Sequence, residues 1–452
     1  MTVAARTGGP RICVVGGGPS GLSAAWYLAK RGYRNVTVLE RLARAGGKCH
    51  SITHDGRPVD LGAFTLTYAY GDVLAIAREM GIELVPQPNR LAADWDVRPV
   101  RIQSIFAMLR SFHSLPAILL ASVRYLFALW KYRSVLAPAG LAGMSAHGRF
   151  PELSKPFHEW AAAGGTTPLV DVFRLAVTDM GYGHVRELPA GYVLNYMNFK
   201  NTLTIGLFLV GLGFGWPRRV RDGFGRLWIA LSWRLDVRLR SAITRITRGE
   251  TIAVEWTNEA TGTAHREEFD RLIISCEPAR LATAIDWTPE ERDLFSKVLT
   301  NDYWVTVYDS DGLPSETIDV MKGVEANRAG HPWETMRPWT ESSAVVFYTF
   351  GEGRLTWETR NQQVHDIDAG IREDVAALFP RATLGRVIHQ VRWNDYFPHV
   401  SPADFASGYY DRLQALQGKN GTYLTGALPA FETVAHVTEY SRQLVEREFP
   451  PV

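Results

Sequence analysis

The stretch Gly16-Gly17-Gly18-Pro19-Ser20-Gly21 lies between an apolar strand predicted at 11–15 and a helix predicted at 19–31. A second apolar strand, predicted at 36–39, ends at Glu40. Glycines at this point let the backbone approach a pyrophosphate, and the helix N-terminus offers unpaired N–H groups and the positive end of its dipole. An acid after the second strand is placed to bind the two hydroxyls of a ribose. The pattern predicts a Rossmann-like α/β unit that binds a dinucleotide.

Two segments that follow Glu40 indicate which dinucleotide this is. The first runs from Arg41 to Gly46-Gly47-Lys48, and the second is Asp60-Leu61-Gly62-Ala63-Phe64. A nicotinamide site needs neither segment, whereas both resemble motifs of the flavin amine-oxidase superfamily. The resemblance implies FAD as the cofactor. It implies that the double glycine passes under the pyrophosphate, that Lys48 neutralises phosphate charge, and that Gly62, Ala63 and Phe64 lie against the flavin ring.

The same resemblance implies cofactor contacts in two later segments. A strand residue near Ile243 faces the adenine, and the chain returns through Gly426 into a closing helix at 433–448, which begins with Thr433 and Val434. The superfamily usually has an acid directly after this glycine, which bonds a ribityl hydroxyl. Here that position is Ala427, so we expect one hydrogen bond fewer to the cofactor, worth about 1 kcal/mol.

Composition limits the class of protein. The chain has 452 residues, is 46% apolar and 21% charged, and has a net charge of +2, which disfavours nucleic acid as a partner. Cys13, Cys49 and Cys276 have no metal or redox spacing, so we expect reduced thiols, no metal and a cytoplasmic location. Residues 1–10 lack the apolar run of a signal peptide, and no run is long enough to span a membrane.

The order of predicted elements favours an amine-oxidase type α/β fold in which a discontinuous FAD-binding domain is interrupted by a substrate domain of mixed sheet. We expect three FAD-binding segments, at 9–71, 219–285 and 406–452. A helical insertion or lid at 72–218 separates the first segment from the second, and the substrate-domain sheet at 286–405 separates the second from the third.

One region has an unusual charge pattern. Residues 97–151 contain no Asp or Glu but seven Arg and Lys residues, interleaved with aromatic side chains, and 188–221 is also free of acids. Basic, aromatic and apolar helices suit a membrane surface. Three interpretations stay open: a helical cap with a solvated basic face, a helix that lies on lipid as a peripheral membrane contact, and a lid over an acyl tunnel.

Further motifs resemble one branch of the superfamily, the polyenoic fatty acid isomerases, which move a double bond in a polyunsaturated fatty acid. The similar stretches are Gly46-Gly47-Lys48-Cys49-His50-Ser51, Gly181-Tyr182-Gly183-His184 with Pro189, Tyr192-Val193-Leu194 with Tyr196, Tyr396-Phe397-Pro398-His399-Val400-Ser401, and Tyr440-Ser441. The resemblance covers most of the chain and is weak at 85–150 and 300–390.

This resemblance implies hydride transfer through flavin N5 and a substrate chamber lined by aromatic side chains. By position relative to the family motifs, Phe199 lines the substrate entrance and Arg90 lies near the arginine that holds the substrate carboxylate. Tyr196 and His184 are further candidates for the catalytic site, although a histidine in such a motif is more often structural. The aromatic candidates are Phe64, Tyr182, Tyr192, Tyr196, Phe199, Trp216, Trp393, Tyr396 and Phe397.

Three functions remain in competition at this stage. The leading one is a redox-neutral double-bond isomerase of a fatty acid or polyene. The second is an FAD-dependent oxidase or desaturase of an apolar unsaturated substrate, and the third is a flavin-containing binding protein at a membrane surface. The chain has no HExxH, CxxC or G-x-S-x-G motif, which disfavours metal-dependent and serine hydrolase chemistry. The exact substrate and the oligomeric state are left open.

Overall fold

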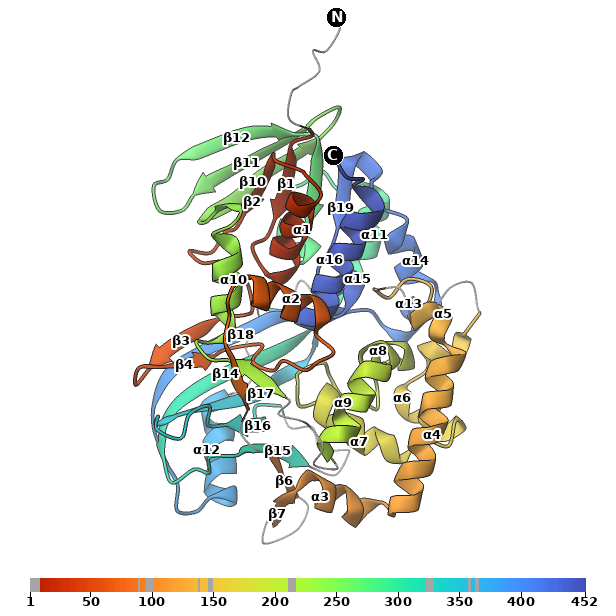
Figure 1. The fold of residues 1–452 in the computed structure, drawn as a ribbon, viewed down its shortest axis with the longest axis vertical. Helices are drawn as coiled ribbons and strands as arrows, with labels where there is room; N and C mark the ends of the chain where they lie inside the picture. Colours follow the sequence, from red (N-terminus) through yellow and green to blue (C-terminus); the bar gives the residue numbers. More distant parts are fainter. Residues whose placement is uncertain are drawn as a thin grey trace, which may run out of the picture.

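A five-stranded parallel sheet forms the top of the molecule in Figure 1. The structure is a computed structural model that describes residues 9–87, 90–94, 101–136, 139–144, 149–209, 217–321, 329–356, 359–361 and 366–452. The strand order is β19 (Thr422–Leu424), β13 (Arg271–Ile274), β1 (Ile12–Val15), β2 (Val36–Leu39) and β9 (Asp236–Arg238). All neighbouring pairs in this sheet are parallel. The predicted Rossmann-like unit is confirmed.

Two helices cover one face of this sheet and tie the N-terminal and C-terminal segments together. Helix α1 (Pro19–Lys30) packs against α16 (Val434–Glu448). Ala25 and Leu28 of α1 share a buried cluster with Leu444 of α16. The hydroxyl of Ser20 lies 3.0 Å from that of Ser441, so a buried polar contact also fixes the C-terminal helix to the glycine-rich loop.

A second, antiparallel sheet extends from the first. It consists of β10 (Ser241–Arg248), β11 (Ile252–Asn258) and β12 (Ala264–Phe269). Arg240 lies between β9 and β10 with a φ of +57°, and it turns the chain from the first sheet into the second.

The third sheet forms the lower left region of Figure 1. Its order is β18 (Thr383–His399), β14 (Leu299–Asp311), β17 (Ala344–Leu355), β16 (Pro332–Met336), β15 (Thr317–Met321), β6 (Arg90–Asp94) and β7 (Arg101–Ser104). Neighbouring strands are antiparallel except β15 and β6. The long strands β14, β17 and β18 contribute apolar side chains that pack on Val59, Leu61 and Phe64 of the FAD-binding half.

Helices on the lower right of Figure 1 form a layer that we call the helical cap, residues 105–209 as far as they are described. Its helices are α3 (Ile105–Phe112), α4 (Leu115–Lys131), α5 (Arg133–Leu136), α6 (Phe157–Ala163), α7 (Pro168–Val177), α8 (Ala190–Tyr196) and α9 (Phe199–Leu209). The insertion expected at 72–218 is therefore largely helical, but it also contributes strands. Because β6 and β7 extend the third sheet beyond β15, some of this insertion belongs to that sheet.

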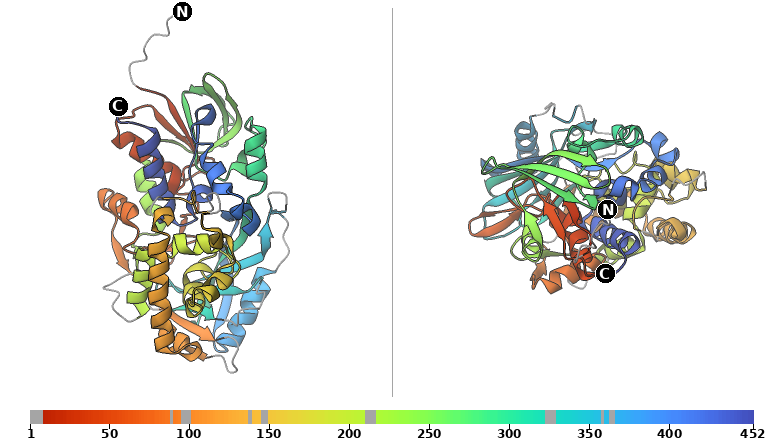
Figure 2. Two further views of the ribbon diagram at one scale, coloured as in Figure 1. Left: turned by 90° about the vertical axis from the view of Figure 1, so that its right-hand side faces the viewer. Right: turned by 90° about the horizontal axis from the view of Figure 1, so that it is seen from above.

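The remaining elements connect these layers. They are α2 (Gly71–Glu79), α10 (Phe224–Ser232), α11 (Pro289–Ser296), α12 (Ile367–Leu378), α13 (Pro402–Ala406), α14 (Tyr409–Gln414) and α15 (Ala427–Ala430), with the strand pairs β3 (Ser51–His54)–β4 (Arg57–Asp60) and β5 (Leu84–Pro86)–β8 (Arg218–Val220). The views in Figure 2 show the elongated body from the side and from above.

Candidate cofactor and substrate site

A cavity of about 870 Å³ begins at the carboxyl ends of the parallel strands and continues between the large sheet and the helical cap. Its wall includes residues at the ends of four strands: Val15 and Gly16 at the end of β1, Glu40 after β2, Ser275 after β13 and Thr425 after β19. Ligands of open parallel sheets bind at this edge, because the loops there diverge and leave a crevice.

The glycine-rich loop is shaped for close approach by a ligand. A Cβ atom on Gly18 would meet nothing closer than the Cα of Gly47, at 3.8 Å, so the cavity side of this residue is open. A Cβ on Gly21 would instead clash with the carbonyl oxygen of Gly16 and lie 2.6 Å from the hydroxyl of Ser275. Helix α1 has no side-chain N-cap, so the N–H groups of its first turn face the loop and can bind an anion such as a pyrophosphate.

Glu40 is held at the wall of the cavity by the backbone. Its carboxylate oxygens accept hydrogen bonds from the N–H of Gly17, at 2.6 Å, and from the N–H of Leu42, at 2.7 Å. Arg41 and Ile243 also line the cavity. A buried carboxylate fixed in this way has remaining lone pairs for sugar hydroxyls, so the geometry fits the ribose contact expected of Glu40.

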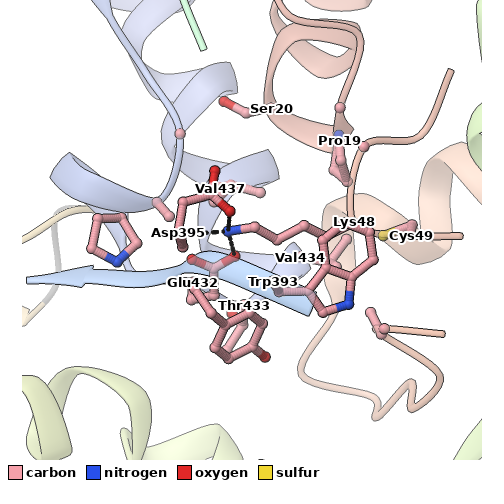
Figure 3. A pocket seen from close by; sticks show the side chains of 18 of the residues that line it. Pro19, Ser20, Lys48, Cys49, Trp393, Asp395, Glu432, Thr433, Val434 and Val437 are labelled. Atoms are coloured by element: carbon pink, nitrogen blue, oxygen red, sulfur yellow. Dashed lines mark hydrogen bonds and ion pairs between the residues drawn. The ribbon is translucent and has the colours of Figure 1, made fainter. Parts of the chain in front are cut away.

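The loop with Gly46 and Gly47 is tied to the first glycine loop, since Gly46 donates from its N–H to the carbonyl of Gly17, at 2.8 Å. Lys48 follows and lies differently from the expectation. Its Nζ is 2.9 Å from the Glu432 carboxylate and 3.6 Å from that of Asp395 (Figure 3). Because two buried carboxylates already neutralise this ammonium, phosphate neutralisation is not the role that the geometry of Lys48 supports.

The pKa values in this triad reflect the pairing. Burial lowers the pKa of Lys48, but Asp395 and Glu432 together raise it above its usual value. Burial raises the pKa of Asp395, but Lys48 and Arg280 outweigh it and lower the pKa to about 2. Lys48 and Asp395 are therefore charged at neutral pH, and the triad joins the loop at 46–48 to β18 and to the C-terminal return.

The segment at 60–64 is positioned by its own aspartate. Asp60 accepts a hydrogen bond from the N–H of Phe224, at 2.8 Å, and burial raises the pKa of its carboxyl group to about 6. Gly62, Ala63 and Phe64 line the cavity. A Cβ on Gly62 would overlap the carbonyl oxygen of Lys48, so only glycine allows these two loops to pass each other.

The C-terminal return completes the cofactor end. Gly426 has a φ of +102°, and Ala427 lies on the wall without a carboxylate. Thr433 caps α16 by accepting from the N–H of His436, at 3.1 Å, and Val434 lines the cavity.

An unpredicted acid lies shortly after the end of β13. Both carboxylate oxygens of Glu277 are buried without a hydrogen-bond partner among the described residues.

The wall of the far end is mostly aromatic. The rings of Phe64 and Tyr348 stack 5.4 Å apart, and those of Tyr303 and Tyr396 stack 4.8 Å apart. Burial raises the pKa of Tyr182, Tyr303, Tyr348 and Tyr396 well above 10, so their phenols stay protonated. The aromatic residues on the wall are Phe64, Tyr70, Tyr182, Tyr196, Tyr303, Tyr348, Trp393 and Tyr396.

Arg90 lies on this wall, but two carboxylates already bind its guanidinium. Nη2 pairs with Asp319 and with Glu334, the latter at 3.1 Å, and both acids are buried. A substrate carboxylate would have to compete with them in a region of low dielectric. The role of carboxylate anchor that the family resemblance implies for Arg90 is therefore not the role its contacts indicate.

Two other candidates do not reach the cavity. Phe199, at the start of α9, is 59% exposed, whereas Asn201 and Thr204 of the same helix line the wall. His184 is exposed in the loop before α8, and its ring lies 5.6 Å from that of Trp333. Tyr196 does line the cavity. Of the other aromatic candidates, Tyr192 and Phe397 are buried away from the wall, and Trp216 lies outside the described residues.

Several residues of the cavity wall are not predicted from the sequence. They are Glu277, Arg280, Tyr303, Tyr348, Asp395 and Glu432. The signal for Glu277 was present, because it follows a buried strand much as Glu40 does. No local pattern marks Tyr303 or Tyr348, since they lie within long strands whose register only the folded sheet defines.

Comparisons with known proteins agree with this geometry. The model of the flavin-containing amine oxidoreductase family matches residues 19–308. The FAD-dependent oxidoreductase dpasF of Apiospora sacchari is 25% identical over 464 residues, which is 97% of this chain and 92% of that protein. The polyenoic fatty acid isomerase of Ptilota filicina is 39% identical over 71 residues, which is 16% of this chain and 14% of that protein.

Among solved structures, the crystal structure of a CLA-producing fatty acid isomerase from P. acnes superposes with a TM-score of 0.80. It is 25% identical, and the alignment covers 98% of this chain and all of that one. The fold and the site thus define an FAD-dependent flavoprotein. This chain belongs to the flavin-containing amine oxidoreductase family, and FAD is its cofactor.

Proposed function

We propose that this protein is an FAD-dependent, redox-neutral isomerase that shifts carbon–carbon double bonds in a polyunsaturated fatty acid or a related polyene. The observation that carries the proposal is the aromatic chamber, which continues directly from the cofactor end of one cavity. Full-length similarity to a fatty acid isomerase supports the same choice.

The cofactor and the chain have separate tasks in this proposal. When bound, FAD supplies a ring nitrogen, N5, that takes a hydride from an activated carbon and returns it to another. The chain has to hold the polyene in place, exclude water and stabilise the positive charge that spreads over a pentadiene when hydride leaves. Aromatic faces attract such a cation, and the stacked Tyr303 and Tyr396 offer them on the wall.

The aromatic end of the cavity offers little for the alternative, a proton transfer by a general base. The carboxyl group of Glu277, which has no hydrogen-bond partner among the described residues, lies at the cofactor end. The phenols of Tyr182 and Tyr396 stay protonated, and each of the nearby charges on Arg90 and Lys48 is paired with carboxylates. His184, the histidine considered for this role, is outside the cavity. The chemistry that these residues favour is stabilisation of a positive charge by aromatic π faces.

The test follows the label of a substrate. We expect that a dienoic fatty acid deuterated at its bis-allylic carbon keeps its deuterium, which reappears at one end of the former pentadiene, with no oxygen consumed. Nuclear magnetic resonance and mass spectrometry of the product locate the label. Loss of the label to water would indicate a base, and a product two hydrogens lighter with peroxide would indicate an oxidase or desaturase. No substrate-dependent change in the flavin spectrum would favour a binding protein.

A pair of variants at one position tests the role of the π faces. Tyr303→Phe keeps the ring, so we expect turnover close to that of the parent. Tyr303→Leu removes it, so we expect turnover to fall about tenfold, since a desolvated cation–π contact contributes about 1–2 kcal/mol. FAD content by absorbance is the control, because both variants should retain it. Equal loss of turnover in the two variants would contradict this role.

A further inference from the structure

The outer face of α4 is apolar although no described element covers it. Val123, Phe127 and Trp130 are 65%, 68% and 58% exposed, and Leu119, Leu120 and Leu126 are exposed on the same helix. The inner side of this helix packs normally, with Tyr125 buried and its hydroxyl bonded to the carbonyl of Met197, at 2.9 Å. Figure 2 (left) shows α4 as the long orange helix running along the outside of the cap.

The charge around this face is mostly positive. Residues 97–151 contain no acid, and Arg110, Arg124, Lys131 and Arg133 are all exposed on α3 to α5. Two acids that reach these helices from later segments are occupied, since Glu152 binds Lys131 and Asp171 binds His113. Some stretches of the acid-free regions, 97–100, 137–138, 145–148 and 210–216, lie outside the described residues.

The geometry of α3 and α4 fits a position on the membrane surface better than a transmembrane position. No single helix in the described ranges is long and apolar enough to span a bilayer, and α3 and α4 reach that length only as a pair bent by 97°. A helix with an apolar outer face, flanking cations and an interfacial tryptophan lies in the plane of the membrane, where the apolar side chains insert between lipids and the cations bind phosphate groups.

The cap also separates this outer surface from the cavity. Ile105 of α3 and Asn201 and Thr204 of α9 line the cavity. On the same two helices, Phe106, Phe112, Phe199 and Leu203 are exposed. An acyl chain that leaves a bilayer beside the cap therefore meets apolar side chains on the outside and the aromatic chamber on the inside.

We infer that the outer face of α4, with the exposed apolar residues of α3, docks onto an anionic phospholipid bilayer. The protein is then a peripheral membrane protein that lies on the lipid with its cap. Uptake of an acyl substrate from that bilayer rests on the proposed function, whereas the docking itself does not.

The test is co-sedimentation of the full-length FAD-loaded protein with vesicles of phosphatidylcholine, either alone or mixed with phosphatidylglycerol. We expect binding to the mixed vesicles that weakens as salt rises from about 50 to 500 mM, because exposed charges are screened. Trp130→Gln should lower the binding constant about tenfold, since one large apolar side chain no longer inserts. Arg110→Gln should lower it about fivefold, and only on anionic vesicles.

Trp233 provides a matched control. It is 67% exposed just after α10, away from the cap, and it has an arginine over its ring, as Trp130 does. Trp233→Gln should bind vesicles like the parent protein. Any of three results would overturn the proposal. These are an equal loss of vesicle binding in the two tryptophan variants, binding that does not depend on salt or anionic lipid, and a dimer that Trp130→Gln dissociates. Docking that persists while the deuterium test fails would remove only the proposed reaction.

Discussion

The two ends of the cavity recognise their ligands in different ways. At the cofactor end the wall is mainly backbone, and it comes from short loops at strand ends whose glycines allow close approach. At the far end the wall is mainly side chains from helices and long strands, and the ionic group there, Arg90, is paired with Asp319 and Glu334. Polar groups that can bind a ligand are therefore concentrated at the cofactor end, while the far end offers shape and π surface.

The largest expected effect tests the far end. Arg90→Gln leaves two buried carboxylates without their counter-ion, so we expect the free energy of unfolding to fall by about 3–5 kcal/mol. Denaturant unfolding of the FAD-loaded protein measures it. If Arg90 instead anchored a substrate carboxylate, the variant would keep its stability and show only a raised KM.

A second substitution makes this test specific. In the double variant Arg90→Gln with Asp319→Asn, one of the uncompensated charges is gone, so some of the lost stability should return. Asp319→Asn alone also breaks the pair, so the two single losses should sum to more than the loss in the double variant. Simple additivity would show that Arg90 and Asp319 do not act as a pair.

The next prediction compares the effects of substituting two helical glycines, one at each end of the cavity. Gly21→Ala drives a Cβ into the Gly16 carbonyl, so we expect about 3 kcal/mol of destabilisation and loss of FAD on gel filtration. Gly206 lies on α9 in the cap, and a Cβ there meets nothing within 4 Å. Gly206→Ala should therefore stabilise the protein by about 0.5–1 kcal/mol and leave FAD bound. Similar effects of both changes would remove the contrast between the two ends.

The last effect concerns pH and Glu277. Burial raises the pKa of this carboxyl group to about 7 in the folded protein, against a usual value of 4.5. Between these values the folded state binds a proton that the unfolded state does not, so this group's contribution to stability falls as pH rises and is lost above the folded pKa. Glu277→Gln should remove that slope and stabilise the FAD-free protein by about 2 kcal/mol at pH 8.

Thermal unfolding between about pH 5 and 8 measures this difference, with Glu290→Gln as the control, since Glu290 is an exposed partner of Lys419. We expect the control to follow the pH profile of the parent protein. A Glu277→Gln profile identical to that of the parent would show that the carboxyl group titrates normally.

The same contrast explains what the sequence could predict. The cofactor end could be predicted because its motifs are contiguous in the sequence. Gly16, Gly21 and Gly62 belong to such motifs, and each is required where two segments of backbone pass close together. The substrate end depends on register in a sheet that joins β6, from the first quarter of the chain, to β15. Arg90 contacts Asp319 only because β6 pairs with β15. The sequence alone does not show this contact, so the prediction that Arg90 holds a substrate carboxylate could not include the competing Asp319. Phe199 could be placed on a helix from sequence, but not on one particular face.

The strand order of the parallel sheet has a consequence for how the protein is made. Ser20 leaves the ribosome early, yet its partner Ser441 is 421 positions later in the chain. At about 5–20 residues per second, translation of that interval takes roughly 20 to 80 seconds. For most of that time the apolar β1 lacks β13, and throughout it β1 lacks the C-terminal helix that covers its face. The C-terminal return and α16 are synthesised last, so only a finished polypeptide can close around its flavin.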